Sequence, residues 1–281
     1  EISGGSRVIS LNGLTSTTAK AVVLSRLQAE AKKTFVVVTD SNRELDTFRR
    51  DLDFFQSQIP NPKSKILSLP SFETDVYSGV SPHAETLERR ALALWKLAGS
   101  ATDFLLLSAR SLITRTIKPA RLEFLGAVLQ RYKDFSPEDL LRRLIAAGYV
   151  REEPLNNVGQ FSVRGGIVDI WSPDAENPVR IEFFGDTVDS IREFDPETQL
   201  STRQLDHISL APMREFAATP DDLRDWAVLA RERFADPRFA RTLRDRTDFA
   251  DEGETFAGWE FFFPLVKPAD GSVFDYLTDP V

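Results

Sequence analysis

The stretch QFSVRGGIVDIWSPDAENPVRIEFFGDTVDSIREFDPETQL, residues 160–200, decides the fold of the middle of the chain. Apolar and β-branched residues alternate there with short turns rich in Gly, Pro, Asp and Asn, which are residues that turns favour. The pattern predicts strands joined by tight turns, and it continues on both sides of the quoted segment. The expected strands are Tyr149–Glu152, Gln160–Val163, Ile167–Trp171, Val179–Phe184, Thr187–Phe194 and His207–Leu210.

A single helix is expected just before these strands. Ser136 can cap it, Pro137 suits its first turn, and Glu138 and Asp139 place negative charge near its positive end. Gly148 is expected to end it. One helix and a series of strands define a small α+β domain.

Strands and helices alternate in the part of the chain that precedes this domain. Such alternation predicts a parallel sheet with crossover helices, and so an α/β fold class. The expected strands are Arg7–Leu11, Thr34–Thr39, Lys65–Leu69 and Asp103–Ser108. The expected helices are Thr18–Ala31, Ser41–Phe55, His83–Ala98 and Ala109–Ile117.

Helix-forming sequence returns after the small domain. Asp221–Phe234 predicts a helix, Ala235–Gly258 is too charged to assign, and Ser272–Leu277 resembles the start of another strand. The small domain therefore interrupts a larger one. The expected domains are residues 1–132, the small domain at 133–211, and a return to the larger domain at 212–281.

Length and charge limit the class of protein. A chain of 281 residues is long for one core, which favours two domains. The net charge is −8, from 35 basic and 43 acidic side chains, whereas proteins that hold long duplex DNA usually present a basic surface. The charge therefore favours a protein partner over nucleic acid.

The chain has no Cys, and His83 and His207 are its only histidines. Disulfides and thiolate metal sites are excluded, and a histidine metal site or a catalytic triad is disfavoured. No apolar run is long enough to cross a membrane, and the N-terminus lacks a signal-peptide core. We therefore expect a cytoplasmic protein with no metal site.

The segment GLTSTTAK, residues 13–20, lies where a nucleotide-binding P-loop would follow the first expected strand. The working pattern is G-x-x-x-x-G-K-[ST], in which backbone amides surround the phosphates and the Lys neutralises them. Gly13 fits, but Thr18 and Ala19 occupy the second Gly and the Lys positions. Lys20 falls one residue late, and one residue turns a helical side chain by about 100°. Lys20 therefore cannot take over the role.

The acidic pair that accompanies a P-loop is also missing from its usual context. Asp251 and Glu252 lie in polar sequence and do not follow an apolar strand. We interpret the larger domain as a degenerate P-loop NTPase or helicase-like fold that does not hydrolyse nucleotide. No catalytic residue and no cofactor are expected in this chain.

Glu182, Asp186 and Asp189 lie close together in the sequence and could serve a glycosidase or a metal-dependent nuclease. Asp186, however, follows Gly185 in a typical hairpin turn sequence. Turn formation is therefore the favoured explanation of these carboxylates.

The opening stretch also carries a family resemblance. Residues 163–171 read VRGGIVDIW, residues 180–186 read RIEFFGD, and residues 189–195 read DSIREFD, followed by Gln199. These segments match, in order and spacing, a pattern shared by the second domain of UvrB and of the transcription-repair coupling factors. The chain closely resembles that domain.

Other segments favour the coupling factors. Residues 81–83 (SPH), 256–260 (FAGWE) and 264–265 (PL) resemble them. UvrB has an intact P-loop and a Tyr-rich hairpin that clamps DNA, whereas residues 71–83 here are short and contain only Tyr77. The chain thus resembles the N-terminal, UvrB-like module of the coupling factors over essentially its whole length.

The resemblance implies a function and a set of residues. In that family the small domain binds UvrA, and the matching positions here are Arg164, Arg180 and Phe184. The module has lost ATPase function there, while ATP and Mg²⁺ act in motor domains elsewhere in a DNA translocase that displaces stalled RNA polymerase. The resemblance also implies weak or no DNA binding by this part alone, and a docking surface that is masked in the resting full-length protein.

Strand periodicity supports two of these positions. Ile181 and Phe183 share one face of the expected strand, whereas Arg180, Glu182 and Phe184 share the other. An exposed Phe beside an Arg is typical of a binding hot spot. The competing interpretation packs Phe184 under a loop and pairs Arg180 with Glu182 or with the turn aspartate.

Exposure of Arg164 rests on the resemblance alone, because a bulge at Gly165-Gly166 would break the alternation. Arg192 also fits the pattern, and a structural role for it is left open. Two other functions compete with UvrA recruitment: a UvrB-type DNA-dependent ATPase or helicase, and a module that binds damaged DNA with steep salt dependence.

Overall fold

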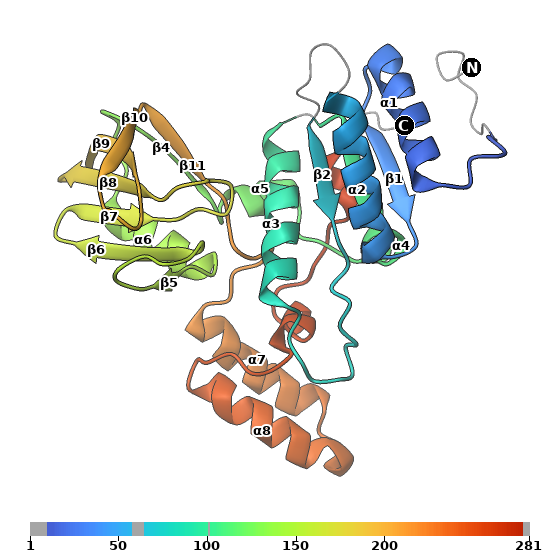
Figure 1. The fold of residues 1–281 in the computed structure, drawn as a ribbon. Coiled ribbons are helices and arrows are strands. Elements are labelled where there is room, and N and C mark those ends of the chain that lie inside the picture. The colour runs from blue at the N-terminus through green and yellow to red at the C-terminus, as the bar shows by residue number, and fades with distance from the viewer. Residues whose placement is uncertain (1–9, 58–64, 101, 278–281) are drawn as a thin grey trace.

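The computed structural model describes residues 10–57, 65–100 and 102–277, and it combines parallel and antiparallel sheets in a mixed α/β architecture (Figure 1). The helices are α1 Thr17–Ala31, α2 Asn42–Ser57, α3 Ala84–Gly99, α4 Ala109–Ile113, α5 Pro119–Glu123, α6 Pro137–Ala146, α7 Pro220–Arg233 and α8 Ala240–Asp251. The strands are β1 Phe35–Thr39, β2 Ile66–Leu69, β3 Phe104–Ser108, β4 Ala127–Gln130, β5 Val150–Arg151, β6 Gln160–Arg164, β7 Ile167–Ile170, β8 Val179–Phe184, β9 Thr187–Phe194, β10 Ser201–Leu205 and β11 His207–Leu210. Short 3-10 helices are η2 Pro237–Phe239, η3 Trp259–Phe261, η4 Phe263–Leu265 and η5 Val273–Tyr276.

The first sheet has three parallel strands in the order β1-β3-β2, which confirms the predicted parallel sheet. The middle strand is buried on both faces, as expected for a parallel strand covered by helices. Phe104 and Leu106 face a core formed with α1 and α2, whereas Leu105 and Leu107 face a core formed with α3 and α5. Because successive side chains of β3 point to opposite faces of the sheet, this one strand contributes to the cores beneath both layers of helices.

The carboxyl edge of this sheet is closed by the protein's own side chains. Asn42 donates to the Ser71 carbonyl at 2.9 Å and accepts from the Ser71 amide at 2.8 Å. The buried guanidinium of Arg90 donates to the Pro70 carbonyl at 2.6 Å and forms an ion pair with buried Glu215. Ligands of open α/β sheets bind at this edge, so these contacts occupy the usual position of a ligand.

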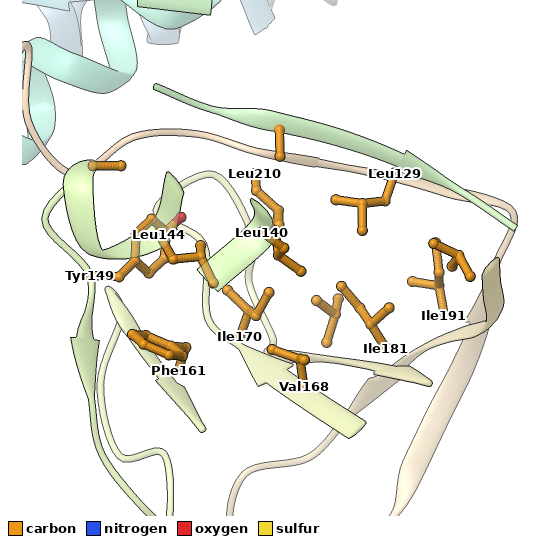
Figure 2. Close-up of a cluster of buried hydrophobic side chains, with 14 residues drawn as sticks. Leu129, Leu140, Leu144, Tyr149, Phe161, Val168, Ile170, Ile181, Ile191 and Leu210 are labelled. Atoms are coloured by element: carbon orange, nitrogen blue, oxygen red, sulfur yellow. The ribbon is translucent and has the colours of Figure 1, made fainter. Parts of the chain in front are cut away.

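The second sheet has six strands in the order β10-β9-β8-β7-β6-β5, antiparallel except for the β5–β6 pair. One face packs against α6 and the two-stranded sheet β4-β11 (Figure 2). Figure 2 shows Val168, Ile170 and Ile181 of this face pointing toward Leu129 and Leu210 of the smaller sheet. We call the opposite face of the six-stranded sheet the outer face.

The start and stop signals of α6 act as predicted. The Ser136 hydroxyl accepts from the Asp139 amide at 3.4 Å, and Pro137 is the first helical residue. Gly148 follows the helix with φ +94°, a conformation that glycine adopts without steric cost. Local sequence therefore determines both ends of this helix.

A fourth hydrophobic core lies toward the C-terminal end of the chain, where α7 and α8 pack side by side (Figure 1). The buried aromatic residues of its core are Trp226, Phe256, Trp259 and Phe263. A capping box starts α7, because Thr219 and Asp222 bond each other's backbone amides. The chain then returns through η3, η4 and η5 to the parallel sheet, where Tyr276 donates to the Ile117 carbonyl at 2.7 Å.

Several expectations about local structure need correction. Ser272–Leu277 is not a strand: η5 occupies most of it, because its capping box between Ser272 and Asp275 favours a helical turn. The helix expected over Ala109–Ile117 ends at Ile113, since residue 116 bridges to residue 271 instead. The charged stretch Ala235–Gly258 contains α8, and β4 and β10 had no clear sequence signal.

The strand expected at Arg7–Leu11 falls mostly outside the described residues, and Ser10 and Leu11 lie in a loop. The strand expected at Tyr149–Glu152 is shorter than predicted, comprising only β5. The remaining expected elements are confirmed to within a few residues. The proposed domain boundaries at residues 132 and 211 stay a prediction.

Candidate functional site on the outer face

A tight turn between β6 and β7 places Arg164 at the rim of the outer face. Gly165 has φ +61°, and a side chain at Gly166 would meet the Phe183 carbonyl oxygen at 2.9 Å. The β6–β7 register continues without a shift to the pair Arg164–Ile167. No bulge breaks the alternation in this pair of strands, so Arg164 extends from the outer face.

Asp169 occupies the centre of the site. It lies on β7 directly opposite Arg180 of β8, and its side chain is buried. Its carboxylate accepts from Arg180 Nε at 2.7 Å and Nη2 at 2.9 Å, which is a bidentate pair, and from Arg164 Nη2 at 2.7 Å. Charge-assisted bonds of this kind are strong and directional. One buried carboxylate thus orients both arginines.

Arg180 is held from two further sides. Its guanidinium lies 4.7 Å from the ring centroid of Phe194, and Nη2 also donates to Gln199 Oε1 at 3.3 Å. The hydrogen bond with Asp169 raises the pKa of Arg180, and the negative charges of Asp169 and Glu182 add to this despite partial burial. Its side chain is 17% exposed, so the group is fixed in position but reachable.

Arg164 is the more accessible arginine. Its side chain is 47% exposed, and besides Asp169 it lies 3.7 Å from a Glu153 carboxylate oxygen. Two arginines share the Asp169 carboxylate, and Glu153 offsets the second positive charge, so these four residues are neutral overall. Both guanidinium groups remain partly exposed, and the fork of N–H donors of an arginine suits a partner carboxylate.

Phe184 extends the site along β8 and is 84% exposed. Ile181 is fully buried and Phe183 packs partly against the core, which confirms the predicted strand faces. The alternative that packs Phe184 under a loop is wrong. Spacing along a strand places Phe184 roughly 13 Å from Arg180, so one partner surface can contact both residues.

Glu182 lies between these residues and pairs with Arg192, while accepting from Ser190 Oγ at 2.8 Å. This ion pair gives Arg192 a structural role. Among the described residues Arg180 pairs with neither Glu182 nor Asp186, so the alternative pairing is wrong and Asp169 is its actual partner.

The three neighbouring carboxylates do not converge on a catalytic centre. Glu182 is held by Ser190 and Arg192, Gly185 has φ +60° in the hairpin turn, and Asp189 falls at the irregularity in the β8–β9 register. The turn interpretation is confirmed. No group of three metal-ligating side chains occurs in residues 10–57, 65–100 or 102–277.

Sequence reasoning missed Asp169, Phe194 and Gln199 as parts of the site. Asp169 carried a signal, because it is a charged residue between Val168 and Ile170 in an otherwise apolar strand. Buried carboxylates are rarely found without a partner. Its place opposite Arg180 depends on strand register, which the sequence did not provide.

The P-loop position has a different arrangement. Ser16 caps α1, accepting from the Ala19 amide at 3.1 Å, and Thr18 donates to Asp51 at 3.1 Å. An anion at a helix N-terminus needs free amides. Here a side chain of the protein already uses one of them.

Comparison with known proteins places these features in a family. Residues 128–216 match the UvrB interaction domain family. This segment contains the whole outer face and the residues that build it.

The chain is 36% identical over 269 residues to a transcription-repair-coupling factor of Myxococcus xanthus, covering 93% of this chain and 22% of the relative. It is 28% identical over 261 residues to that of Haemophilus influenzae, covering 93% and 22%, and 29% identical over 273 residues to that of Mycobacterium tuberculosis, covering 93% and 21%. The predicted resemblance is confirmed: the chain is homologous to a segment of the transcription-repair-coupling factors.

The chain spans about a fifth of the length of these curated relatives. In the part of the chain that the structure describes, no helix is both long and apolar enough to cross a membrane.

Proposed function

We propose that the chain is a non-catalytic module that recruits UvrA in a transcription-repair coupling factor, and that the outer face is its docking surface. The observation that carries the proposal is the exposure of Phe184 on the same face of β8 as Arg180, which Asp169 orients together with Arg164. This arrangement lies within the segment that matches the UvrB interaction domain family.

The geometry suits binding in two ways. Burying an exposed Phe stabilises a complex by about 1.5–3 kcal/mol. Arg180 is held by Asp169, Gln199 and Phe194 before a partner arrives, so little side-chain entropy is lost on binding. A partner surface with a carboxylate beside an apolar pocket would match these features.

The role of the whole protein is part of the proposal. Kinship with the coupling factors supports an ATP-dependent DNA translocase that displaces stalled RNA polymerase, with ATP and Mg²⁺ bound in motor domains outside this chain. RNA polymerase and DNA would be reached through the full-length protein. The domain around the parallel sheet would be a degenerate P-loop NTPase or helicase-like scaffold, into which the smaller α+β domain is inserted.

The direct test measures binding of purified UvrA to this chain by isothermal titration calorimetry, comparing wild type with Phe184→Ala. Removing a hot-spot aromatic typically costs about 2 kcal/mol or more, which is about thirtyfold in Kd. Phe124→Ala is the matched control, because Phe124 is also strongly exposed but lies on the parallel-sheet unit after α5. Equal affinity of Phe184→Ala and wild type would refute the docking surface.

A second variant tests the arginine geometry. Arg180→Glu would place a second carboxylate against buried Asp169 and so confuse lost binding with lost folding. Arg180→Lys keeps the charge but cannot reproduce the fork of donors. We expect weaker capture of UvrA by a folded Arg180→Lys variant.

Nucleotide binding separates the proposal from a UvrB-type ATPase. The Ser16 cap on α1 and the displaced Lys20 support a module without ATP chemistry. We expect no binding of Mg²⁺–ATP in titration calorimetry, and no difference between wild type and Lys20→Ala. Tight binding that depends on Lys20 would favour the ATPase function instead.

A further inference from the structure

A second surface, remote from the outer face, has the features of a binding cleft. The cleft has a volume of about 460 Å³ and lies between the loop of residues 72–80 and the α7–α8 pair. Its apolar lining comes mainly from Tyr77, Trp226, Phe234, Phe239 and Leu243. Pockets of this size and composition commonly bind ligands.

Three aromatic residues of this cleft are exposed to solvent. Tyr77 is 92% exposed, Phe239 is about half exposed and Phe234 is partly exposed. Val76, on the same wall, is also exposed. Single exposed apolar side chains are ordinary, but a group that lines one cleft marks an interaction site.

The loop that carries Tyr77 is held in place by polar contacts. Asp75 accepts from the Tyr77 amide at 2.9 Å, and its carbonyl accepts from the Ser78 amide at 3.0 Å. At the base of the loop, Ser81 donates to Glu260 at 2.8 Å and accepts from the Gly258 amide at 3.0 Å. The cleft is therefore preformed, which reduces the entropy lost on binding.

One stretch of the helical wall, residues 231–246, differs in charge from the whole chain. Residues 231–246 contain six arginines and three acids, a net charge of +3, whereas the chain carries −8. Asp251 and Asp236 neutralise two of these arginines, Arg231 and Arg238. Within the described residues the others form no ion pair, namely Arg233, Arg241, Arg244 and Arg246.

Two of the unpaired arginines lie at the cleft itself. The guanidinium of Arg246 lies 4.4 Å from the centroid of the Phe262 ring and forms part of the cleft wall. Arg244 lines an adjoining hollow of about 520 Å³ that shares Phe234 and Leu243 with the cleft. Cationic groups thus adjoin an apolar floor.

We propose that this cleft docks a short acidic segment of a partner protein, with a large apolar side chain in the aromatic cleft and carboxylates against Arg244 and Arg246. The proposal is independent of UvrA recruitment by the outer face. An apolar wall with few hydrogen-bonding groups suits a Leu or Phe side chain better than a nucleobase edge. Outside residues 231–246 the chain carries −11, obtained as −8 minus +3, which opposes a long nucleic acid.

The test uses the whole chain and a fluorescein-labelled synthetic peptide of sequence Glu-Asp-Glu-Leu-Phe-Asp-Glu-Leu-Asp, measured by fluorescence anisotropy. We expect saturable binding that weakens at least about tenfold in Tyr77→Ala and in Arg246→Glu. Tyr132→Ala and Arg50→Glu are matched controls, because both residues are exposed on other elements. Thermal unfolding of each variant checks that the fold is retained.

Peptide controls and rival ligands complete the test. Replacing Leu and Phe of the peptide by Ser, or its acids by Gln, should each abolish binding. No saturable binding by wild type, or equal binding by Tyr77→Ala, would overturn the proposal. It would also be overturned if a labelled oligothymidine bound this cleft in preference to the peptide, or if wild type formed dimers that Tyr77→Ala did not.

Discussion

Arginine–carboxylate ion pairs occur both beside the parallel sheet and on the six-stranded sheet, but they differ in their exposure to solvent. In the parallel-sheet region Arg90 and Glu215 are 0% and 2% exposed, and they close the carboxyl edge. On the outer face of the six-stranded sheet Asp169 is equally buried, but Arg180 and especially Arg164 reach solvent. Both members of the first pair are inaccessible, whereas the arginines bound to Asp169 expose cationic groups to solvent.

The difference shows how burial decides whether an arginine that is paired with a carboxylate stays accessible to solvent. Arg90 also donates to Ser111 at 2.7 Å and lies 4.3 Å from the Phe72 ring centroid, so its donors are used within the fold. Arg180 has the same kinds of neighbours, an acid and a ring, yet it stays partly accessible. Sequence composition alone would not distinguish these two arginines.

The largest effect is expected from Arg90→Ala. Removing one partner of a buried ion pair leaves Glu215 charged and unpaired, which typically costs about 3–5 kcal/mol. We expect urea unfolding to show this loss in free energy, while the folded fraction binds UvrA as wild type does. Arg203→Ala, which breaks an exposed pair with Glu193, should lower the free energy of unfolding far less. A similar loss from both variants would contradict the distinction.

Asp169→Asn should affect both stability and recognition. The amide matches the shape of the carboxylate but cannot accept from two arginines in the same way, so we expect a loss of about 1–3 kcal/mol in unfolding free energy. Because Arg164 and Arg180 remain present but less well oriented, affinity for UvrA should also fall. Asp169→Glu, which restores the charge, should recover part of the affinity. If Asp169→Asn lowered the free energy of unfolding but left the affinity for UvrA unchanged, Asp169 would not position the arginines for binding.

Arg164→Ala should have a small effect on stability and a clear effect on binding. Its side chain is half exposed and Asp169 keeps Arg180 as a bidentate partner, so unfolding free energy should change by about 1 kcal/mol or less. UvrA affinity measured by calorimetry should fall. This loss of affinity should be larger at low salt than at high salt, whereas the loss caused by Phe184→Ala should depend less on salt. Arg142→Ala on α6, an exposed arginine paired with Asp139, is the control.

The smallest effect concerns Glu260, a buried carboxylate with no arginine partner among the described residues. Burial raises its pKa above 4.5, although the bond from Ser81 and the charge of Arg214 act in the opposite direction. The folded state therefore favours the neutral form, and stability is lost as pH rises from 4.5 through the raised pKa. Glu260→Gln should increase unfolding free energy at neutral pH but not below pH 4.5. Glu254→Gln, at an exposed position, should change neither value.

Periodicity and turn signals predicted most of the architecture. The parallel sheet, α6 with its Ser136 cap, and the hairpin at Gly185 follow from local rules of strand, cap and turn chemistry. The errors occur where local signals are weak or compete. The charged α8 has a narrow apolar stripe, and the apolar stretch before residue 278 adopts a capped 3-10 turn.

Local sequence signals also predicted part of the candidate site. Alternation along β8 correctly placed Phe184 in solvent and Ile181 in the core. The role of Arg164 came only from family resemblance. Asp169, which organises both arginines, was missed because its partners lie on two neighbouring strands.

The sequence by itself determined the resemblance to the coupling factors, most of the order of elements, the faces of β8 and the failure of the P-loop pattern, because each depends on residues close together along the chain. Only the tertiary structure decided that Asp169 joins Arg164 and Arg180, that Arg90 and Glu215 close the sheet edge, and that Tyr77 faces α7 and α8. The residues in these contacts are either distant in sequence or brought together by the register of paired strands. Long-range packing sets such distances, and local residue preferences do not encode them.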